Sequence, residues 1–118
     1  MIKIIIGVSI MLGVLNILFP PVEVCGNSMF PTYRDKELIL GTRLYLKRNL
    51  KRGDVILYKT EDERIVIKRI NHIKTKGKDL EFYCLGDNSK DSYDSRHYGF
   101  VSSKQLVCKA LKSRPKKI

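Results

Sequence analysis

The chain lacks most of the sequence signatures that mark ligand-dependent proteins. Its 118 residues contain no zinc-ligand spacing, no phosphate-binding loop and no stacked aromatic motif typical of a nucleic-acid-binding module. No internal repeat, heptad pattern or low-complexity linker is present, so the length accommodates one small domain. We therefore expect no metal, no cofactor and no nucleic-acid partner.

Histidine and cysteine are scarce, and each scarcity restricts the chemistry. The two histidines have no obvious carboxylate partner, so we expect a structural role for His72 and a loop position for His97. The three cysteines, Cys25, Cys84 and Cys108, are an odd number, and we assign no disulfide among them. Cys84 and Cys108 lie in apolar, strand-like segments, which predicts buried structural thiols.

Acidic residues are few relative to basic ones. The 23 lysines and arginines outnumber the 12 aspartates and glutamates, which gives a net charge of +11. Such an excess indicates contact with something anionic, either nucleic acid or a lipid surface. Because no nucleic-acid motif accompanies the charge, we expect an anionic lipid surface as the partner.

Residues 2–19 form an almost wholly apolar run whose one charge is that of Lys3. About 20 residues of helix cross the hydrocarbon core of a bilayer, so the run is just long enough to span it. Pro20 and Pro21 then end the helix. A cleavable signal peptide is the competing interpretation, but no Ala-x-Ala-like site follows the run.

The flanking charges predict how this segment is oriented. The amino terminus and Lys3 precede the run, and Glu23 is the only charge between the run and Arg34. By the positive-inside rule, the N-terminus lies in the cytoplasm and the body lies outside. We therefore expect a single transmembrane anchor at residues 1–19 and one extracytoplasmic domain at residues 20–118.

After residue 21 the pattern becomes that of short strands separated by turns. Alternating or β-branched apolar residues predict strands at residues 22–25, 37–46, 55–59, 64–73, 80–85 and 106–111. Gly53, Gly77 and Gly86 mark turns, and Ser102 and Ser103 predict one helical turn before the last strand. The expected fold is an all-β domain with a compact, barrel-like shape.

A short polar turn, GNSMFPT at residues 26–32, lies between the apolar run and the strands and carries a candidate nucleophile, Ser28. A serine hydroxyl attacks poorly unless a base lies within hydrogen-bonding distance. Since neither histidine has a carboxylate partner, the base must be another residue type. Lys68 is the candidate.

Lys68 lies in the run RIVIKRI, whose β-branched residues predict a strand. Alternation places it on the face of Val66 and Ile70, where an ammonium is poorly solvated and the pKa of the lysine falls. We expect Arg69 to lower that pKa further by like-charge repulsion. A neutral amine at this point accepts the proton of Ser28. Because the opposite face is apolar too, the alternative is an edge-strand lysine that extends to water.

Four motifs occur in a definite order: SMFPT at residues 28–32, GDVI at 53–56, KR at 68–69 and GDNSKDSYDSRHYGFV at 86–101. In this order they resemble bacterial type I signal peptidases, and the last stretch is the most recognisable. The resemblance runs from the apolar N-terminal segment nearly to the C-terminus. A single Ser-Met-x-Pro is weak evidence, but four ordered motifs around a serine and a lysine are strong evidence.

The resemblance implies a minimal, membrane-bound serine endopeptidase with a β-sheet core, which removes signal peptides from exported preproteins without a cofactor. Ser28 would attack the peptide carbonyl and form an acyl-enzyme, with Lys68 as general base. The backbone N–H of Ser28 is a candidate oxyanion donor. Many relatives carry a second donor, a serine, two residues earlier, where this chain and some other members have glycine. Gly26 leaves the second donor open, or serves through its backbone freedom.

The resemblance also assigns supporting and substrate-binding residues. In the last motif, Ser92 would hydrogen-bond Lys68 and fix its orientation, while Asp94 and Arg96 would pair and brace the loop. The signal peptide would lie extended between the strand before Ser28 and the strand of Lys68. Three apolar residues are candidates for shallow pockets that admit only small, Ala-like side chains: Val24, Met29 and Ile67.

Other functions are compatible with parts of the sequence. The nearest alternative is a specialised relative that matures one cognate secreted or pilin-like partner. A non-enzymatic alternative is a membrane-anchored β module that binds anionic polymers, which explains the charge but leaves the Ser28 and Lys68 motifs as coincidence. A soluble, self-cleaving Ser/Lys repressor is opposed by the apolar run at residues 2–19.

Overall fold

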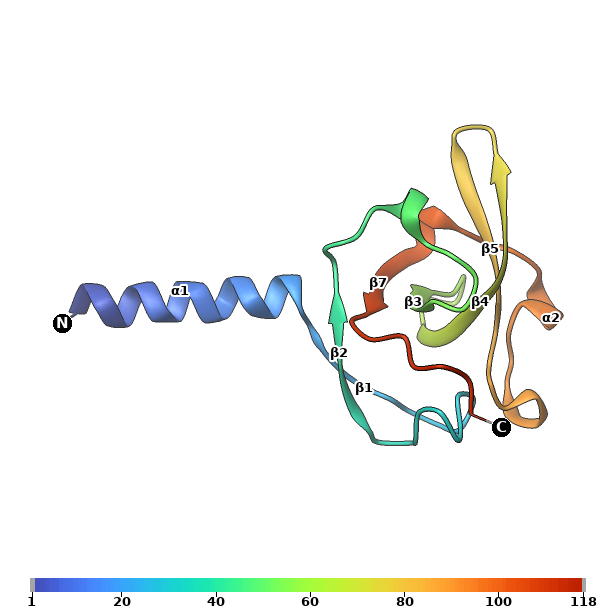
Figure 1. The fold of residues 1–118 in the computed structure, drawn as a ribbon, viewed down its shortest axis with the longest axis horizontal. Coiled ribbons are helices and arrows are strands. Elements are labelled where there is room, and N and C mark those ends of the chain that lie inside the picture. Colours follow the sequence, from blue (N-terminus) through green and yellow to red (C-terminus); the bar gives the residue numbers. More distant parts are fainter. Residues whose placement is uncertain (1, 118) are drawn as a thin grey trace.

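The computed structural model describes residues 2–117, and for residues 2–7 it describes the backbone alone. Within this part of the chain, one N-terminal helix precedes a β body (Figure 1). In chain order the elements are α1 (Ile2–Leu18), β1 (Pro21–Glu23), β2 (Leu38–Thr42), η1 (Lys47–Asn49), β3 (Val55–Lys59), β4 (Ile65–Lys76), β5 (Asp79–Leu85), η2 (Ser89–Asp91), α2 (Ser95–Tyr98), β6 (Val101–Ser102), η3 (Ser103–Gln105) and β7 (Leu106–Ala110).

Strand β3 lies at the centre of the sheet, and its first four residues are buried. Because side chains alternate along a strand, Val55 and Leu57 enter one apolar cluster while Ile56 and Tyr58 enter the other. The first cluster is completed by the Ser28 turn and β7, and the second by β4, β5 and β6. The sheet therefore has an apolar core on each of its two faces.

Antiparallel pairs join the strands of the described residues 2–117 into a seven-stranded sheet of order β1-β2-β7-β3-β4-β5-β6. β1 and β6 are its edges, and they do not pair with each other. The expected all-β body is therefore confirmed, but the barrel-like shape is wrong in one respect, because the sheet is open. The strand pattern of the sequence predicts individual strands and carries no information on closure.

The predicted strands are found with small shifts at their ends. β3 has the expected limits, and β7, β5 and β2 lie within their expected ranges or within one residue of them. β4 is longer than expected and turns at Gly77, whose φ is +62°, directly into β5. The helical turn expected at Ser102 and Ser103 is η3, with the Ser102 hydroxyl accepting the backbone N–H of Lys104. The sequence did not predict η1, η2, α2 or β6.

Strand β4 contains an irregularity that changes the position of a predicted residue. The register with β5 shifts between Ile70 and His72, where one strand carries an extra residue. Regular strand alternation would place His72 on the face of Lys68, but His72 is exposed and its ring packs edge-on against Phe100. Ile70 stays in the core. The bulge therefore turns His72 away from the face of Lys68.

Helix α1 projects from the β body (Figure 1). Arg43 makes two hydrogen bonds to the C-terminal end of α1. Its guanidinium donates to the carbonyl of Ile17, and its backbone N–H donates to the carbonyl of Leu18 at 2.9 Å. A cation at this end complements the helix dipole and satisfies carbonyls that have no partner within the helix.

The predicted helix at the N-terminus is therefore present, but its predicted span is not supported. Across residues 2–117, no helix combines the length and the apolarity that crossing a membrane requires. The sequence run of residues 2–19 was judged just long enough, whereas the helix ends at Leu18, before the two prolines. The orientation predicted from the amino terminus and Lys3 depends on groups that lie outside the described residues and side chains.

Candidate active site

The turn that carries Ser28 is fixed by contacts to a distant loop. The backbone N–H of Asn88 donates to the Ser28 carbonyl at 2.8 Å, and the Asn88 side chain donates to the Asn27 carbonyl at 3.0 Å. Met29 is fully buried in the core directly after the serine. Gly26 has a φ of +89°, and its N–H donates to the carboxylate of Asp35 at 2.7 Å. The expectation that Gly26 serves through its backbone freedom is consistent with this left-handed conformation.

Gly86 allows the loop and the turn to approach each other. A side-chain β-carbon at this position would lie 2.2 Å from the Ser92 hydroxyl oxygen and 2.6 Å from the Ser28 carbonyl oxygen. The second of these atoms belongs to the backbone and cannot swing aside. A residue without a side chain is therefore required where the two segments meet.

Lys68 reaches Ser28 from β4. Its position is set by the β3–β4 ladder, in which Ile56 lies opposite Lys68 and Tyr58 lies opposite Val66. The Lys68 side chain is buried, with 4% of the residue exposed, and its Nζ donates to Ser28 Oγ at 2.9 Å. The structure thus brings together the two residues proposed from the sequence as nucleophile and base. The alternative, an edge-strand lysine whose side chain extends to water, does not agree with the burial of Lys68.

Burial controls the protonation of Lys68. Removal of the ammonium from water lowers the pKa of Lys68 below its ordinary value, and the nearby Asp94 carboxylate opposes this shift. Arg64 and Arg96 add smaller repulsive contributions that also lower the pKa of Lys68. Arg69 was expected to supply the repulsion, but its side chain is directed elsewhere. Strand alternation explains the difference, because neighbouring side chains point to opposite faces.

Arg69 belongs to an ion pair that the sequence did not predict. Its guanidinium makes two hydrogen bonds to the Asp87 carboxylate, at 2.9 and 2.8 Å, and one to the Gly53 carbonyl at 2.8 Å. Both side chains are largely buried. This pair connects the residue after Lys68 to the loop that holds the Ser28 turn. The only signal in the sequence was that Arg69 and Asp87 each stand in a motif.

Asp94 is the centre of the loop's hydrogen bonding. Its fully buried carboxylate accepts from the Gly86 N–H at 2.9 Å, from the Ser92 hydroxyl at 2.7 Å and from the Arg96 guanidinium at 2.9 and 2.5 Å. Burial alone would raise the pKa of Asp94, but the bonds from Arg96, Gly86 and Ser92 outweigh it and hold the pKa well below its ordinary value. The expected contact between Asp94 and Arg96 is thus present.

The expected bond from Ser92 to Lys68 is not what the structure contains. The Ser92 hydroxyl donates to Asp94, so its single proton is already committed to a buried carboxylate. A charged acceptor forms a stronger bond than a neutral amine, which explains the preference.

His97 was expected to be an unassigned loop residue. It lies in α2, where its Nδ1 accepts from the Asp94 N–H at 3.2 Å and completes the N-terminal cap.

A shallow cleft of about 280 Å³ opens over Ser28 and Lys68. Its walls come from the Ser28 turn, the start of β4, the β3–β4 turn and the loop after Gly86. The lining residues are Cys25, Gly26, Asn27, Ser28, Thr60, Arg64, Val66, Lys68, Asp91 and Tyr93. Sequence reasoning missed Thr60, Arg64, Asp91 and Tyr93, which become neighbours of Ser28 only through the tertiary fold.

The three residues predicted to form substrate pockets lie in the core. Val24, Met29 and Ile67 are all buried in one apolar cluster, and none of them lines this cleft. The sequence could not distinguish these positions, because an apolar residue beside a catalytic motif suits a pocket wall and a core equally well. The structure gives all three a packing role beneath the Ser28 turn.

The cysteines and the turn at Gly53 were the other sequence candidates. Burial raises the pKa of the Cys84 thiol to about 12, so it stays protonated. Cys108 is buried too, as predicted, and Cys25 is exposed. Asp54 accepts the N–H of Lys51 at 3.0 Å, which agrees with a structural turn at Gly53. Among residues 2–117, no cluster of three or more histidine, cysteine or acidic side chains has a metal-binding arrangement.

The geometry determines what the site can do. A buried amine with a lowered pKa is neutral in a larger fraction of molecules, and a neutral amine at 2.9 Å from a hydroxyl can accept its proton. The Ser28 backbone N–H makes no hydrogen bond within the described part of the chain, so it is free to receive an anionic oxygen. An activated serine beside a free N–H donor is an arrangement suited to acyl transfer.

Comparison with known proteins gives consistent matches. The model of a family described as signal peptidase, peptidase S26, matches residues 1–75 and 72–113. Signal peptidase I V of Bacillus subtilis (strain 168) is 23% identical over 151 aligned residues, which cover 87% of this chain and 90% of that protein. Signal peptidase I of Buchnera aphidicola subsp. Acyrthosiphon pisum (strain APS) is 53% identical over 32 residues, 27% of this chain and 10% of that protein.

Replacing Asp94 with asparagine should destabilise the fold. The amide cannot match a carboxylate as acceptor for the Gly86 N–H, Ser92 and Arg96 together, and losing charged hydrogen bonds of this kind costs about 2–3 kcal/mol. The free energy of unfolding, measured by urea denaturation, should fall by that amount in Asp94→Asn. The matched control, Asp91→Asn, changes an exposed carboxylate of the same loop and should alter it by less than about 0.5 kcal/mol. Equal stability of the two variants would contradict the central role of Asp94.

Proposed function

Because the chain belongs to the signal peptidase family, peptidase S26, we propose that it is a serine endopeptidase that cleaves signal peptides from exported preproteins with a Ser28–Lys68 dyad. One observation carries the dyad: the buried Lys68 Nζ lies 2.9 Å from Ser28 Oγ, with no other base as close to that hydroxyl among the described hydrogen bonds. The family as a whole removes signal peptides, and the residues that perform the reaction in this chain are the proposal.

The first half of the reaction forms the acyl-enzyme. Neutral Lys68 takes the proton of Ser28 as Oγ bonds to the carbonyl carbon of the scissile peptide, and the carbonyl oxygen becomes an anion. The Lys68 ammonium then gives that proton to the amide nitrogen as the carbon–nitrogen bond breaks. The mature protein leaves with a free amino group, and the signal peptide stays as an ester on Ser28.

The second half repeats the proton transfers with water. Neutral Lys68 takes a proton from a water molecule as its oxygen bonds to the ester carbon, and returns that proton to Ser28 Oγ as the ester bond breaks. The free N–H of Ser28 stabilises the oxyanion in both halves. Gly26 offers no hydroxyl, so the described turn contributes one donor from Ser28 and leaves the second to another backbone group or to water.

Open strand edges suit an extended substrate. In β4, residues 65–68 pair with β3 on one side, while pairing with β5 begins only at Arg69. β1 is an edge strand whose partner is β2. We propose that the residues before the cleaved bond lie between these two edges and end at Ser28, held by backbone hydrogen bonds. The shallow cleft over Ser28 suits a small side chain, such as alanine, next to the cleaved bond.

The loop after Gly86 supports the dyad in this proposal. Asp94 gathers Gly86, Ser92 and Arg96, and its negative charge opposes the shift in the pKa of Lys68. These residues therefore position the site and tune it, and Lys68 does the proton transfer. The assignment makes Asp94, Ser92 and Arg96 supporting residues.

Two alternatives differ from this proposal in what they cleave. A specialised relative that matures one cognate partner would use the same dyad, and it differs in failing to cut unrelated preproteins with Ala-x-Ala sites. A non-enzymatic module that binds anionic polymers would cut neither a cognate partner nor an unrelated preprotein. The buried contact between Lys68 and Ser28 favours an enzyme, because a binding module gains nothing from burying a lysine against a hydroxyl.

We also propose that the chain contacts an anionic lipid surface. Signal peptidases are typically membrane-associated, and α1 exposes apolar side chains such as Ile10, Leu12 and Ile17. The net charge of +11 would add attraction to anionic headgroups. In this proposal apolar contact comes from α1 and the longer-range attraction comes from the basic body.

Removing either member of the dyad should abolish cleavage. Ser28→Ala deletes the nucleophile and Lys68→Met deletes the base, so each should lower kcat/KM for a preprotein with an Ala-x-Ala site by about 1,000-fold or more. The controls Ser89→Ala and Lys90→Met alter exposed residues of the neighbouring loop and should retain activity. Circular dichroism should show all four variants folded. Full activity in Lys68→Met alone would refute the lysine base, and full activity in both dyad variants would refute the proposed function.

The rate and the stability should both depend on the ionisation of Lys68. Because the pKa of Lys68 is lowered, kcat should rise with pH through one ionisation below the ordinary lysine value of about 10.4. The unfolded chain binds this proton more tightly than the folded one. Stability should therefore increase as pH rises from the folded-state pKa of Lys68 to about 10.4, above which the contribution is complete.

The comparison of Lys68→Met with Lys90→Met tests this assignment. The melting temperature of Lys68→Met should lose its rise with pH across that interval, whereas Lys90→Met should retain the wild-type dependence. A flat pH–rate profile in the wild type would show that Lys68 is not the titrating base. A Lys68→Met variant whose stability depends on pH as in the wild type would show the same.

Lipid contact can be measured by cosedimentation with vesicles. The full chain should bind vesicles that contain phosphatidylglycerol and bind neutral phosphatidylcholine vesicles more weakly. Leu12→Asp, which places a charge on the exposed face of α1, should weaken binding to both kinds of vesicle. Equal binding to the two kinds would refute the electrostatic part of the proposal. Wild-type binding by Leu12→Asp would refute the role of α1.

A further inference from the structure

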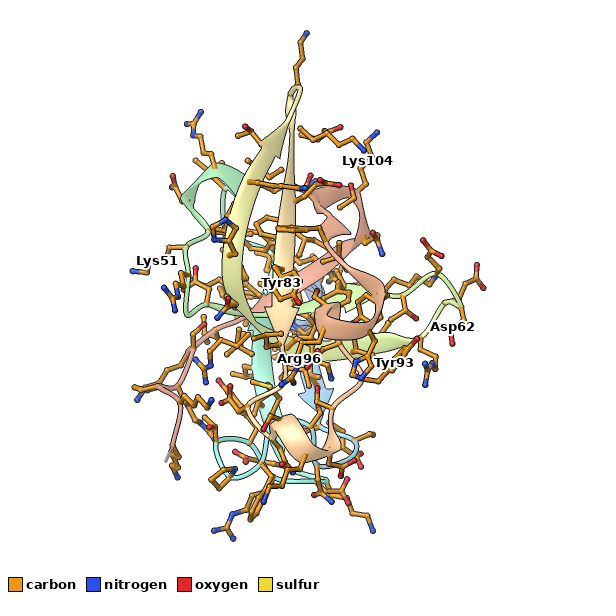
Figure 2. The ribbon with its side chains drawn as sticks, turned by 90° about the vertical axis from the view of Figure 1, so that its right-hand side faces the viewer. Lys51, Asp62, Tyr83, Tyr93, Arg96 and Lys104 are labelled. Carbon is orange, nitrogen blue, oxygen red and sulfur yellow. The ribbon has the colours of Figure 1, made fainter. Side chains whose placement is uncertain are left out.

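A second, larger hollow continues from the cleft over Ser28. It encloses about 590 Å³ and lies among β3, the β3–β4 turn, α2 and η3. Three residues line both spaces: Thr60, Arg64 and Tyr93. In Figure 2, Tyr93 and Asp62 of the β3–β4 turn are seen on the same side of the molecule. The hollow is thus an extension of the cleft that nothing in the proposed mechanism uses.

The walls of this hollow are aromatic. Tyr93, Tyr98 and Phe100 line it, with the fully buried Tyr58 behind them, and Tyr93 packs edge-on against Tyr98 at 5.4 Å between ring centroids. Aromatic rings offer large apolar surfaces of fixed shape. A lining of this kind suits an apolar side chain better than a polar one.

Several polar groups deep in the lining already have partners. The Tyr58 and Tyr98 hydroxyls are hydrogen-bonded to each other. The Gln105 amide donates to the Lys59 carbonyl at 3.0 Å and accepts from the Ser102 N–H at 2.9 Å. A bound group therefore meets satisfied hydroxyls and an occupied amide. Beside these groups a polar occupant would lose its bonds to water without replacing them, which favours an apolar occupant there.

The rim of the hollow is acidic. Asp62 is paired with Arg64 at 2.8 Å, which cancels those two charges. Glu61 takes part in none of the salt bridges found among residues 2–117, so one negative charge remains at the rim of a chain whose net charge is +11. An acidic residue of a bound segment is disfavoured at this point.

The distance from the dyad identifies which part of a substrate reaches the hollow. Arg64, Val66 and Lys68 share one face of the β4 segment and line the cleft in sequence. Four residues of extended chain cover about 13 Å at roughly 3.3 Å per residue. A polypeptide whose first residue before the cleaved bond lies at Lys68 therefore places its fifth residue at Arg64, where the hollow begins.

We infer that this hollow, lined by Tyr93, Tyr98 and Phe100, is a specificity subsite for a large apolar side chain of the substrate, about five residues before the cleaved bond. The inference rests on the proposed function, because it requires a polypeptide that ends at Ser28. It assigns the chain a preference at a second position, separate from the small side chain at the cleaved bond.

The test compares preprotein segments that differ only at the fifth residue before the cleaved bond. One segment has leucine at that position and the other has serine. With the wild type, kcat/KM for the segment with leucine should be about tenfold higher than for the segment with serine. Phe100→Ala should reduce this ratio to about one, and Phe100→Leu, which keeps an apolar wall, should retain most of it. Tyr45→Ala removes a half-buried ring that lines neither space and should preserve the ratio.

A charge comparison tests the rim and needs no change to a packed ring. The wild type should cleave a segment with lysine at the next residue outward faster than one with aspartate, and Glu61→Lys should reverse that order. Equal wild-type cleavage of the leucine and serine segments would overturn the subsite and leave the proposed function intact. If neither segment is cleaved while the protein is folded, the proposed function itself fails, and the subsite fails with it.

Discussion

The cost of burying the ammonium of Lys68 is the constraint on which the site depends. Four residues before it, Arg64 remains exposed, whereas Lys68, on the strand face of Val66 and Ile70, has 4% of its surface exposed. An isolated charge in such surroundings is strongly disfavoured, so either a partner must compensate it or the proton must leave. Asp94 gives partial compensation, because most of its own hydrogen-bonding capacity is used by Gly86, Ser92 and Arg96. The balance leaves the pKa of Lys68 below its ordinary value, with the amine hydrogen-bonded to the Ser28 hydroxyl.

The other interactions of the site serve to maintain this balance. Gly86 lets the loop approach the Ser28 carbonyl, Asn88 ties the two segments together, and the Arg69–Asp87 pair fastens β4 to the same loop. A displacement of any of them would lengthen the contact between lysine and serine or admit water to the amine. Water would restore the ordinary basicity of Lys68. Precision in the loop is thus an electrostatic requirement as well as a geometric one.

Local patterns in the sequence predicted the strands, and the resemblance to signal peptidases supported the pairing of Ser28 with Lys68. Other relations between distant residues were not predicted. Strand-forming runs and glycine turns are determined by residues that are close together in the sequence. The observed positions of β3 and of the turn at Gly77 therefore agree closely with the predicted ones. The open edges of the sheet and the bulge beside His72 depend on how distant strands pair in register. The hydrogen bond that Ser92 donates to Asp94 depends on competition between possible acceptors. Val24, Met29 and Ile67 illustrate the same limit, since apolar character alone does not separate a core from a pocket.

The tie between Asn88 and the Ser28 turn has a consequence for the life of the polypeptide. Ser28 emerges early from the ribosome, Lys68 follows, and the Gly86 loop with Asp94 comes only in the last third of the chain. Until that last third has been translated and folded, nothing fixes the serine against the lysine or shields the amine from water. A prematurely terminated chain therefore contains Ser28 and Lys68 without the loop contacts that fix one beside the other.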